Sequence, residues 1–167
     1  IAQLSLDEKL VHLHDTEFRK QLMSETCLTK KLAGRVSNYE RIFPWDDETP
    51  DYEPPADQSI AARAKREGRD PEELVYDTLL EKDGKRILYR PLSNYAYGDL
   101  NTVGEMMKHP DTLVSLGDGG AHVGVLCDAS SMAYMLTHWT RDRTRGDKVE
   151  LSWAIKRITN DNAKAIG

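Results

Sequence analysis

The residues best suited to chemistry follow a short apolar run in the last third of the chain. Residues 112–116 are almost continuously apolar, which predicts a strand buried on both faces, and Gly117-Asp118-Gly119-Gly120 comes next. Catalytic groups of α/β barrels lie at the C-terminal ends of such strands. Neighbouring glycines let a metal or substrate approach closely. We therefore predict Asp118 as a metal ligand or general base, and His122, four residues later, as part of the same pocket.

Two other interpretations of this turn stay open on the residues alone. An aspartate in a glycine-rich turn also serves as the N-cap of the helix that follows. Glycine-rich turns bind phosphate as well, but Gly-Asp-Gly-Gly-Ala-His lacks the lysine and the spacing of a P-loop. The nucleotide-binding interpretation is therefore the weakest.

Capping residues and hydrophobic periodicity predict the elements around this turn. Ser5 and Ser59 precede helical patterns as N-caps do, one further helix starts near Asp15, and Asp70-Pro71 starts another with proline in the first turn. Helices are expected over 6–13, 15–22, 60–67, 71–80, 99–109, 130–142, 151–159 and 161–166, and strands over 39–43 and 86–89. The acidic, proline-rich segment 44–58 predicts an exposed loop. A site of paired carboxylates is the weaker interpretation, because solvated carboxylates have no reason for shifted pKa values.

The alternation of helices and strands predicts a helix-rich α/β fold. A closed (β/α) TIM-type barrel has eight parallel strands and about 250 residues, whereas two or three strands are expected among these 167 residues. The chain has no initiator methionine, and both of its ends look cut. We therefore expect residues 1–167 to be a C-terminal fragment of such a barrel, carrying its last strands and helices.

Several segments resemble the N-acyl-D-amino-acid deacylases (D-aminoacylases) of the amidohydrolase superfamily. The resemblance is dense from Asp99 onward, and loose before Ser59. It is carried by the segments 60–71, 92–95, 108–110, 116–124, 127–130, 136–139, 154–159 and 163–167. The block Gly-Asp-Gly-Gly-Ala-His, after its apolar run, is fairly specific to this family.

The resemblance implies metal-assisted hydrolysis of the amide bond of N-acyl-D-amino acids. In such enzymes an aspartate of the final barrel strand contacts the metal and acts as general acid and base, and Asp118 matches it. The family's other ligands have no counterpart here, since His12-Leu13-His14 lies in an expected helix, where residues i and i+2 diverge. A zinc site needs at least three protein ligands, so the zinc site is expected to be incomplete and the isolated chain inactive.

Further candidate site residues lie near expected helices and strands. Asn94 and Tyr95 follow an expected strand, and we predict that they bind substrate together with His122. His138 and Trp139 are expected to be packing and helix-surface residues of a helix. The charged residues 141–143 are expected at a solvated helix end.

Composition and charge limit the partners and the location of the protein. A net charge of −5 disfavours nucleic-acid binding, and no apolar run approaches the roughly 20 residues that span a membrane. Cys27 and Cys127 lie far apart and no signal-peptide pattern is present, so a cytoplasmic protein with reduced thiols is expected. Because a cut barrel exposes strand edges, we expect a homodimer or higher oligomer. The alternative to an enzyme fragment is a non-catalytic, self-associating structural or partner-binding domain.

Overall fold

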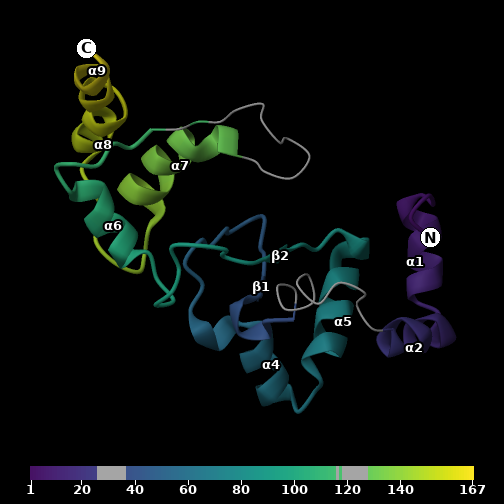
Figure 1. Ribbon diagram of the computed structural model, residues 1–167. Coiled ribbons are helices and arrows are strands. Elements are labelled where there is room, and N and C mark those ends of the chain that lie inside the picture. The colour runs from purple at the N-terminus through teal and green to yellow at the C-terminus, as the bar shows by residue number, and fades with distance from the viewer. Residues whose placement is uncertain (26–36, 116, 118–127) are drawn as a thin grey trace. The chain divides into compact units, whose positions relative to one another are not determined.

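The computed structural model describes residues 1–25, 37–115, 117 and 128–167 (Figure 1). Within these residues the chain forms two compact units, Ile1–Gly98 and Asp99–Gly167. Each unit is helix-rich, and the described part of the chain contains a single small sheet. The prediction of a helix-rich α/β chain is therefore confirmed, and the partial barrel stays a prediction.

The unit Ile1–Gly98 consists of helices around a two-stranded antiparallel sheet. The helices and strands in its described residues are α1 (Leu6–Leu13), α2 (Thr16–Ser24), β1 (Phe43–Pro44), α4 (Ile60–Glu67), α5 (Pro71–Gly84) and β2 (Leu88–Tyr89). In the sheet Phe43 pairs with Tyr89, and Pro44 pairs with Leu88. Short 3₁₀ helices cover Tyr39–Arg41 and Ala56–Gln58, so the strand expected over 39–43 is a 3₁₀ turn followed by β1.

Local capping explains where these helices begin. Ser5 forms a capping box with Glu8 at the start of α1, and Asp15 accepts a hydrogen bond from the Phe18 amide. Ser59 caps α4, which Gly68 ends in the left-handed conformation. Asp70 accepts hydrogen bonds from two amides of α5. These starts agree with the predictions because a cap depends on residues within one turn.

The core of this unit is a cluster of aliphatic side chains between α4 and α5. It contains Ile42, Ile60, Ala64 and Leu74, with Tyr39, Val75 and Leu88 packed against it. Tyr76 of α5 donates a hydrogen bond through its hydroxyl to the Leu13 carbonyl, which ties α1 to α5.

The acidic segment 44–58 is only partly the exposed loop that the sequence predicts. Residues 47–51 are exposed, but Glu53 is 1% exposed and Pro54 is buried. The Tyr89 hydroxyl donates to the Tyr52 carbonyl, and the Tyr95 hydroxyl donates to the Pro54 carbonyl. These long-range bonds hold the second half of the segment against the unit, which its composition alone does not reveal.

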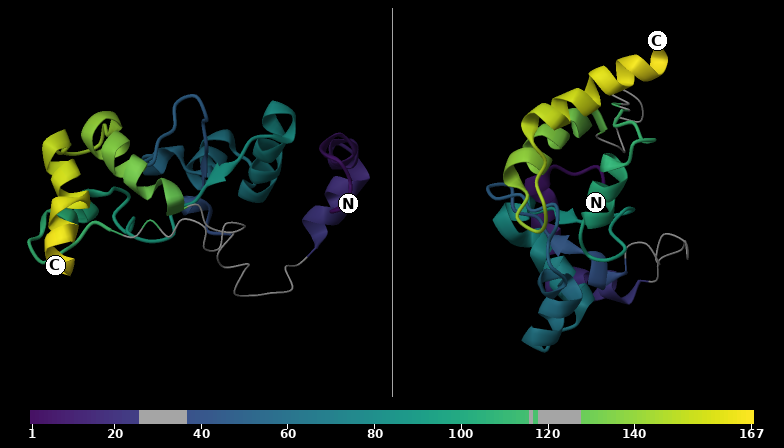
Figure 2. Two further views of the ribbon diagram at one scale, coloured as in Figure 1. Left: turned by 90° about the horizontal axis from the view of Figure 1, so that it is seen from above. Right: turned by 90° about the vertical axis from the view of Figure 1, so that its left-hand side faces the viewer.

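In its described residues the unit Asp99–Gly167 packs four helices and a π-helical turn around one apolar cluster. Its elements are α6 (Asn101–Lys108), α7 (Ser131–Thr137), the π-helical turn His138–Asp142, α8 (Leu151–Ile158) and α9 (Asn160–Ile166). A 3₁₀ turn covers Asp128–Ser130. Met135, Trp139, Val149 and Ala154 form the buried cluster. Only Thr159 separates α8 from α9, which follows on from it (Figure 2).

Candidate functional site

The segment that leads toward Asp118 has no regular secondary structure where the structure describes it. Residues 112–115 form neither helix nor strand, and Leu113 is exposed. The prediction of a strand buried on both faces is therefore wrong for these residues, and Leu116 lies outside the described part. The physical reason is that no strand in the described part of Asp99–Gly167 lies beside the segment to accept and donate the ladder of hydrogen bonds.

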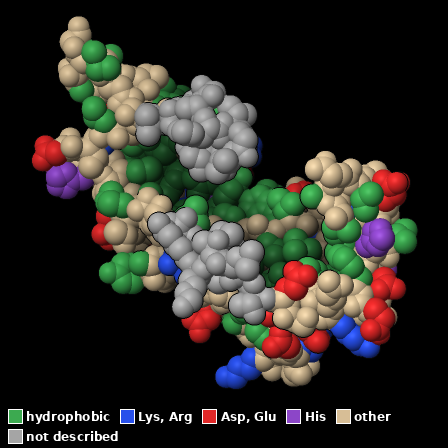
Figure 3. Space-filling view, turned by 45° about the vertical axis from the view of Figure 1, so that its right-hand side comes forward, with side chains coloured by type: hydrophobic (Ala, Val, Ile, Leu, Met, Phe, Trp, Pro, Cys, Tyr) green, Lys and Arg blue, Asp and Glu red, His purple; other side chains and the backbone are tan. Residues whose placement is uncertain are grey.

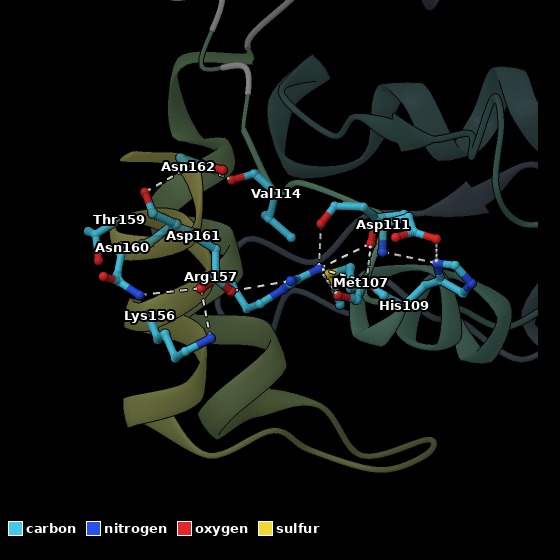
Figure 4. Close-up of polar contacts among 12 residues, drawn as sticks. Met107, His109, Asp111, Val114, Lys156, Arg157, Thr159, Asn160, Asp161 and Asn162 are labelled. Carbon is cyan, nitrogen blue, oxygen red and sulfur yellow. Dashed lines mark hydrogen bonds and ion pairs between the residues drawn. The ribbon is translucent and has the colours of Figure 1, made fainter. Parts of the chain in front are cut away.

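Side chains of α8 and α9 bind the carbonyl groups of this segment instead (Figure 4). We call Arg157, Asp161 and Asn162 the Arg157 cluster. The Arg157 Nη2 atom lies 2.7 Å from the Met107 carbonyl oxygen, 3.1 Å from that of His109 and 2.7 Å from that of Thr112. It also lies 3.1 Å from the Thr112 hydroxyl, so its two hydrogens are shared among four acceptors.

These contacts follow from the end of α6. The last carbonyl groups of a helix have no partner within it, and a cation there also interacts favourably with the helix dipole. Arg157 binds the carbonyls of Met107 and His109 at this end and reaches on to Thr112. Arg157, a residue that is 7% exposed, thus joins the end of α6 to the start of the segment 112–115.

Asp161 and Trp153 hold the guanidinium in place. The Arg157 Nη1 atom donates to Asp161 Oδ2 at 3.2 Å, and its Cζ lies 5.6 Å from the centre of the Trp153 ring. The Lys156 ammonium pairs with Asp161 Oδ1 at 2.7 Å. The pKa of Asp161 lies below its ordinary value, mainly because of the hydrogen bond from Lys156. The hydrogen bond from Arg157 and the two positive charges lower this pKa further, and together these effects outweigh burial, which raises it.

Asn162 binds the same segment one step further along. Its Nδ2 atom donates to the Val114 carbonyl at 2.9 Å and to the Ile158 carbonyl at 3.3 Å. Its Oδ1 atom is buried and accepts no hydrogen bond from any described residue. The side-chain amide of Asn162 therefore donates to the segment as the N–H of a neighbouring strand would, and its Oδ1 atom accepts no hydrogen bond from the described residues.

The low pKa of Asp161 predicts acid sensitivity of the unit. An aspartate whose folded pKa lies below its unfolded value of 3.8 stabilises the fold above that value, and the contribution is lost as the pH falls through the folded pKa. We expect the unfolding free energy to fall from about pH 5 toward pH 2, and to fall less steeply in Asp161→Asn. Urea unfolding at several pH values measures these slopes. Lys156→Gln brings the folded pKa of Asp161 closer to its unfolded value, so the loss of unfolding free energy on acidification should become smaller. An unchanged slope in Asp161→Asn would contradict the assignment.

The predicted site residues fall in different parts of the chain. Asp118 and His122 lie outside the described residues, and Gly117 is the described residue that precedes Asp118. Asn94 is exposed and has a positive φ of 58°. Tyr95 is buried: its hydroxyl lies 2.9 Å from the Pro54 carbonyl, and its own carbonyl accepts a hydrogen bond from Arg41. Both belong to the unit Ile1–Gly98, so their predicted role beside Asp118 stays a prediction.

Tyr95 also lines an open hollow of about 560 Å³ on its own unit. Arg41, Phe43, Lys65 and Tyr97 are among the other lining residues, whereas Asn94 is not. Tyr97 is largely exposed there. The side chains that line the hollow are both charged and apolar.

The sequence of this chain matches one known protein family over most of its length. The sequence model of the amidohydrolase family matches residues 34–167, which is most of the chain. The chain belongs to the amidohydrolase family. Comparisons with curated proteins and with solved structures gave no match. Amidohydrolases are in general metal-dependent hydrolases, and this matched range includes Asp118 and the Arg157 cluster.

The described residues of this amidohydrolase do not fit the metal that the family implies. No three His, Cys, Asp or Glu side chains among them come together as a metal-ligand group. His12 and His14 are both exposed, His12 within α1 and His14 at its end.

Among the residues that the structure describes, no helix is long and apolar enough to cross a membrane.

Sequence reasoning missed the Arg157 cluster and misplaced Arg143 in this amidohydrolase. Arg143 was expected at a solvated helix end, but it is 2% exposed and its guanidinium stacks 4.5 Å from the centre of the Trp139 ring. It donates to the Asp147 carbonyl and to Asn101 Oδ1, both at 2.8 Å. Gly146 makes room for it, because an added Cβ there would lie 2.6 Å from Arg143 Nη2.

A weak signal for Arg157 was present in the sequence. It follows the buried Ala154 by three residues, so both lie on the same face of α8. An arginine on the buried face of a helix needs acceptors within the fold. The sequence does not show that those acceptors are the carbonyl groups at the end of α6. His138 and Trp139 are both buried, so the prediction is confirmed for packing and wrong for a place on the helix surface.

Proposed function

We propose that this amidohydrolase chain is the C-terminal part of a (β/α) barrel that hydrolyses the amide bond of N-acyl-D-amino acids, with Asp118 as its general acid and base. The family match over residues 34–167 carries the proposal. The glycine-flanked position of Asp118 supports it, because glycines leave space for substrate beside the carboxylate.

The proposed reaction of Asp118 follows from the needs of amide hydrolysis. Water must lose a proton as it attacks the carbonyl carbon, and the leaving amine must gain one before it departs. A single carboxylate beside both groups performs the two transfers in turn. Zinc is the metal we propose for the intact site, and its ligands would lie outside the described residues, because these hold no ligand group. His122, Asn94 and Tyr95 are the proposed substrate-binding residues.

Self-association is the second element of the proposal. Several large hydrophobic side chains are well exposed, and the most exposed are Val11, Leu92, Tyr97 and Ile166. On the face drawn in Figure 3, hydrophobic side chains reach the surface between charged ones. We propose that two or more copies of the chain cover such side chains, which burial would stabilise by about 25 cal/mol per Å² of apolar surface.

The proposal is tested by measuring the zinc affinity of the chain and of its Asp118→Ala variant. We expect the isolated chain to be inactive and to bind zinc weakly. Asp118→Ala should lower the zinc affinity by about tenfold or more, since even outer-shell partners of a metal contribute 10- to 100-fold. Zinc titration followed by mass spectrometry of the metal content measures this, with light scattering to give the mass of the assembly. Hydrolysis of N-acetyl-D- and N-acetyl-L-amino acids is assayed in the same samples.

Asp47→Ala is the matched control, because Asp47 is an exposed aspartate of the other unit. It should leave zinc binding unchanged. Zinc binding or hydrolysis that survives Asp118→Ala unchanged would contradict the assignment of Asp118. A monomer at every practical concentration would contradict self-association.

A further inference from the structure

We propose that a hollow on the unit Ile1–Gly98 binds the phosphate group of a small organic phosphate. We call it the arginine hollow, because Arg63, Arg66 and Arg86 line it together with Trp45. Its volume is about 440 Å³, within the range of roughly 300–1,000 Å³ that small-molecule pockets have. Binding there does not depend on the role of Asp118.

The three arginines reach the hollow from two separate segments of the fold. Arg63 and Arg66 are three residues apart in α4 and lie on the same side of that helix. Arg86 lies two residues before β2, and the Trp45 amide, directly after β1, donates to the Ile87 carbonyl at 3.1 Å. Positive charges that converge in this way repel one another, and an anion between them replaces the repulsion by attraction.

Arg63 and Arg86 leave most of their donors unused within the described part of the chain. A guanidinium carries five N–H donors. Arg63 Nη2 lies 3.5 Å from Glu67 Oε1, which is too long for a good hydrogen bond. Arg86 Nε lies 3.3 Å from Glu81 Oε2, yet this buried atom has no hydrogen-bond partner among the described residues. The two arginine side chains are only 27% and 17% exposed, so water does not surround them.

The two aspartates of the hollow are bound by their own loop. The Glu48 amide donates to Asp46 Oδ1 at 3.1 Å, and the Thr49 hydroxyl donates to Asp46 Oδ2 at 3.0 Å. The Glu53 amide donates to Asp51 Oδ1 at 2.8 Å. Among the described residues, neither carboxylate forms an ion pair with an arginine of the hollow. The arginine donors therefore stay available, while the two negative charges reduce the attraction that an anion feels.

A phosphate ester matches this wall better than a carboxylate does. One guanidinium fork satisfies the two oxygens of a carboxylate, whereas a phosphate ester offers three oxygens and a charge of about −1.5 to −2. Trp45 gives the organic part of the ligand a surface to pack on. Its ring centre lies 5.0 Å from that of Tyr52 and 5.4 Å from that of Tyr89, so the ring is held in place.

An NMR titration of the full chain tests the proposal. Trp45 lines the hollow, whereas Trp139 and Trp153 belong to the other unit, so the indole N–H resonance of Trp45 reports binding locally. The resonance is assigned with Trp45→Phe, and phenyl phosphate, inorganic phosphate and phenylacetate are added in separate titrations. We expect saturable binding, tightest for phenyl phosphate, weaker for inorganic phosphate and weakest for phenylacetate. The Trp139 and Trp153 resonances should stay in place.

Variants of the arginines identify the groups that bind the phosphate. Arg63→Gln and Arg86→Gln should each weaken phenyl phosphate binding about tenfold or more, because each removes charge-assisted hydrogen bonds. Arg63→Lys should recover only part of the loss, since lysine keeps the charge but lacks the planar fork.

A change of opposite sign and a matched control separate binding from stability. Asp51→Asn should strengthen binding, because it removes a negative charge while Oδ1 can still accept from the Glu53 amide. A damaged fold cannot produce such a gain. Lys65→Gln removes the same charge from α4 as Arg63→Gln does, but Lys65 lines the hollow at Tyr95. It should leave the affinity unchanged.

Several results would overturn the proposal. They are an unmoved Trp45 resonance with phenyl phosphate, unchanged affinity in both arginine-to-glutamine variants, an equal loss in Lys65→Gln, and weaker binding in Asp51→Asn. Phenylacetate that binds as tightly as phenyl phosphate would overturn the assignment of a phosphate group. Circular dichroism of each variant checks the fold, and if Arg86→Gln fails to fold, Arg63→Gln and Asp51→Asn decide the outcome.

Discussion

Replacing Trp139 with alanine is expected to destabilise the unit Asp99–Gly167 by about 3–5 kcal/mol, the usual cost of removing a buried aromatic ring. Trp139 is 2% exposed and packs in the cluster with Met135, Val149 and Ala154. Its ring lies so close to α6 that a Cβ added to Gly104 would be 3.2 Å from Cζ3. Far-UV circular dichroism during urea unfolding measures the loss.

The contact with Arg143 adds to the effect. The Arg143 guanidinium lies over the Trp139 ring, and this cation–π interaction is lost with the ring. Trp139→Phe keeps an aromatic face and should cost less than Trp139→Ala. Leu151→Ala is the control, since Leu151 is exposed on α8 and should change stability by no more than about 0.5 kcal/mol. Equal losses in Trp139→Ala and Leu151→Ala would show that the ring is not part of the core.

Ile60→Ala should have the largest effect in the unit Ile1–Gly98, about 2–5 kcal/mol. The Ile60 side chain is 0% exposed and lies among Ile42, Ala64 and Leu74. Its amide also donates to the Ile42 carbonyl at 2.8 Å, so the helix start and the core meet at this residue.

A graded series checks this prediction. Ile60→Val removes one methylene and should cost about 0.5–1.5 kcal/mol. Ile87→Ala removes a similar side chain that is exposed, and it should be close to neutral. The order Ile60→Ala, Ile60→Val, Ile87→Ala in decreasing loss of unfolding free energy is the expected result, and a different order would refute the assigned core.

The sequence by itself determined the features that depend on a few neighbouring residues. Ser5, Asp15, Ser59 and Asp70 marked helix starts because an N-cap binds amides within its own first turn. The same local information predicted α6, α8 and α9 to within about two residues. Similarity along the chain was enough to predict the amidohydrolase family, which the match over residues 34–167 shows.

Only the tertiary structure decided the roles of the charged and polar residues that the fold encloses. Charged residues are typical of protein surfaces, yet three of them are buried in the described part of the chain: Glu53, Arg143 and Arg157. Residues 112–115 have the composition of a buried strand, yet they are irregular and bound by side chains. For Arg143, Arg157 and residues 112–115 the outcome depends on partners that lie 42 to 48 residues away in the sequence. A strand needs a neighbour and a buried charge needs acceptors, and the folded chain alone determines which of these it receives.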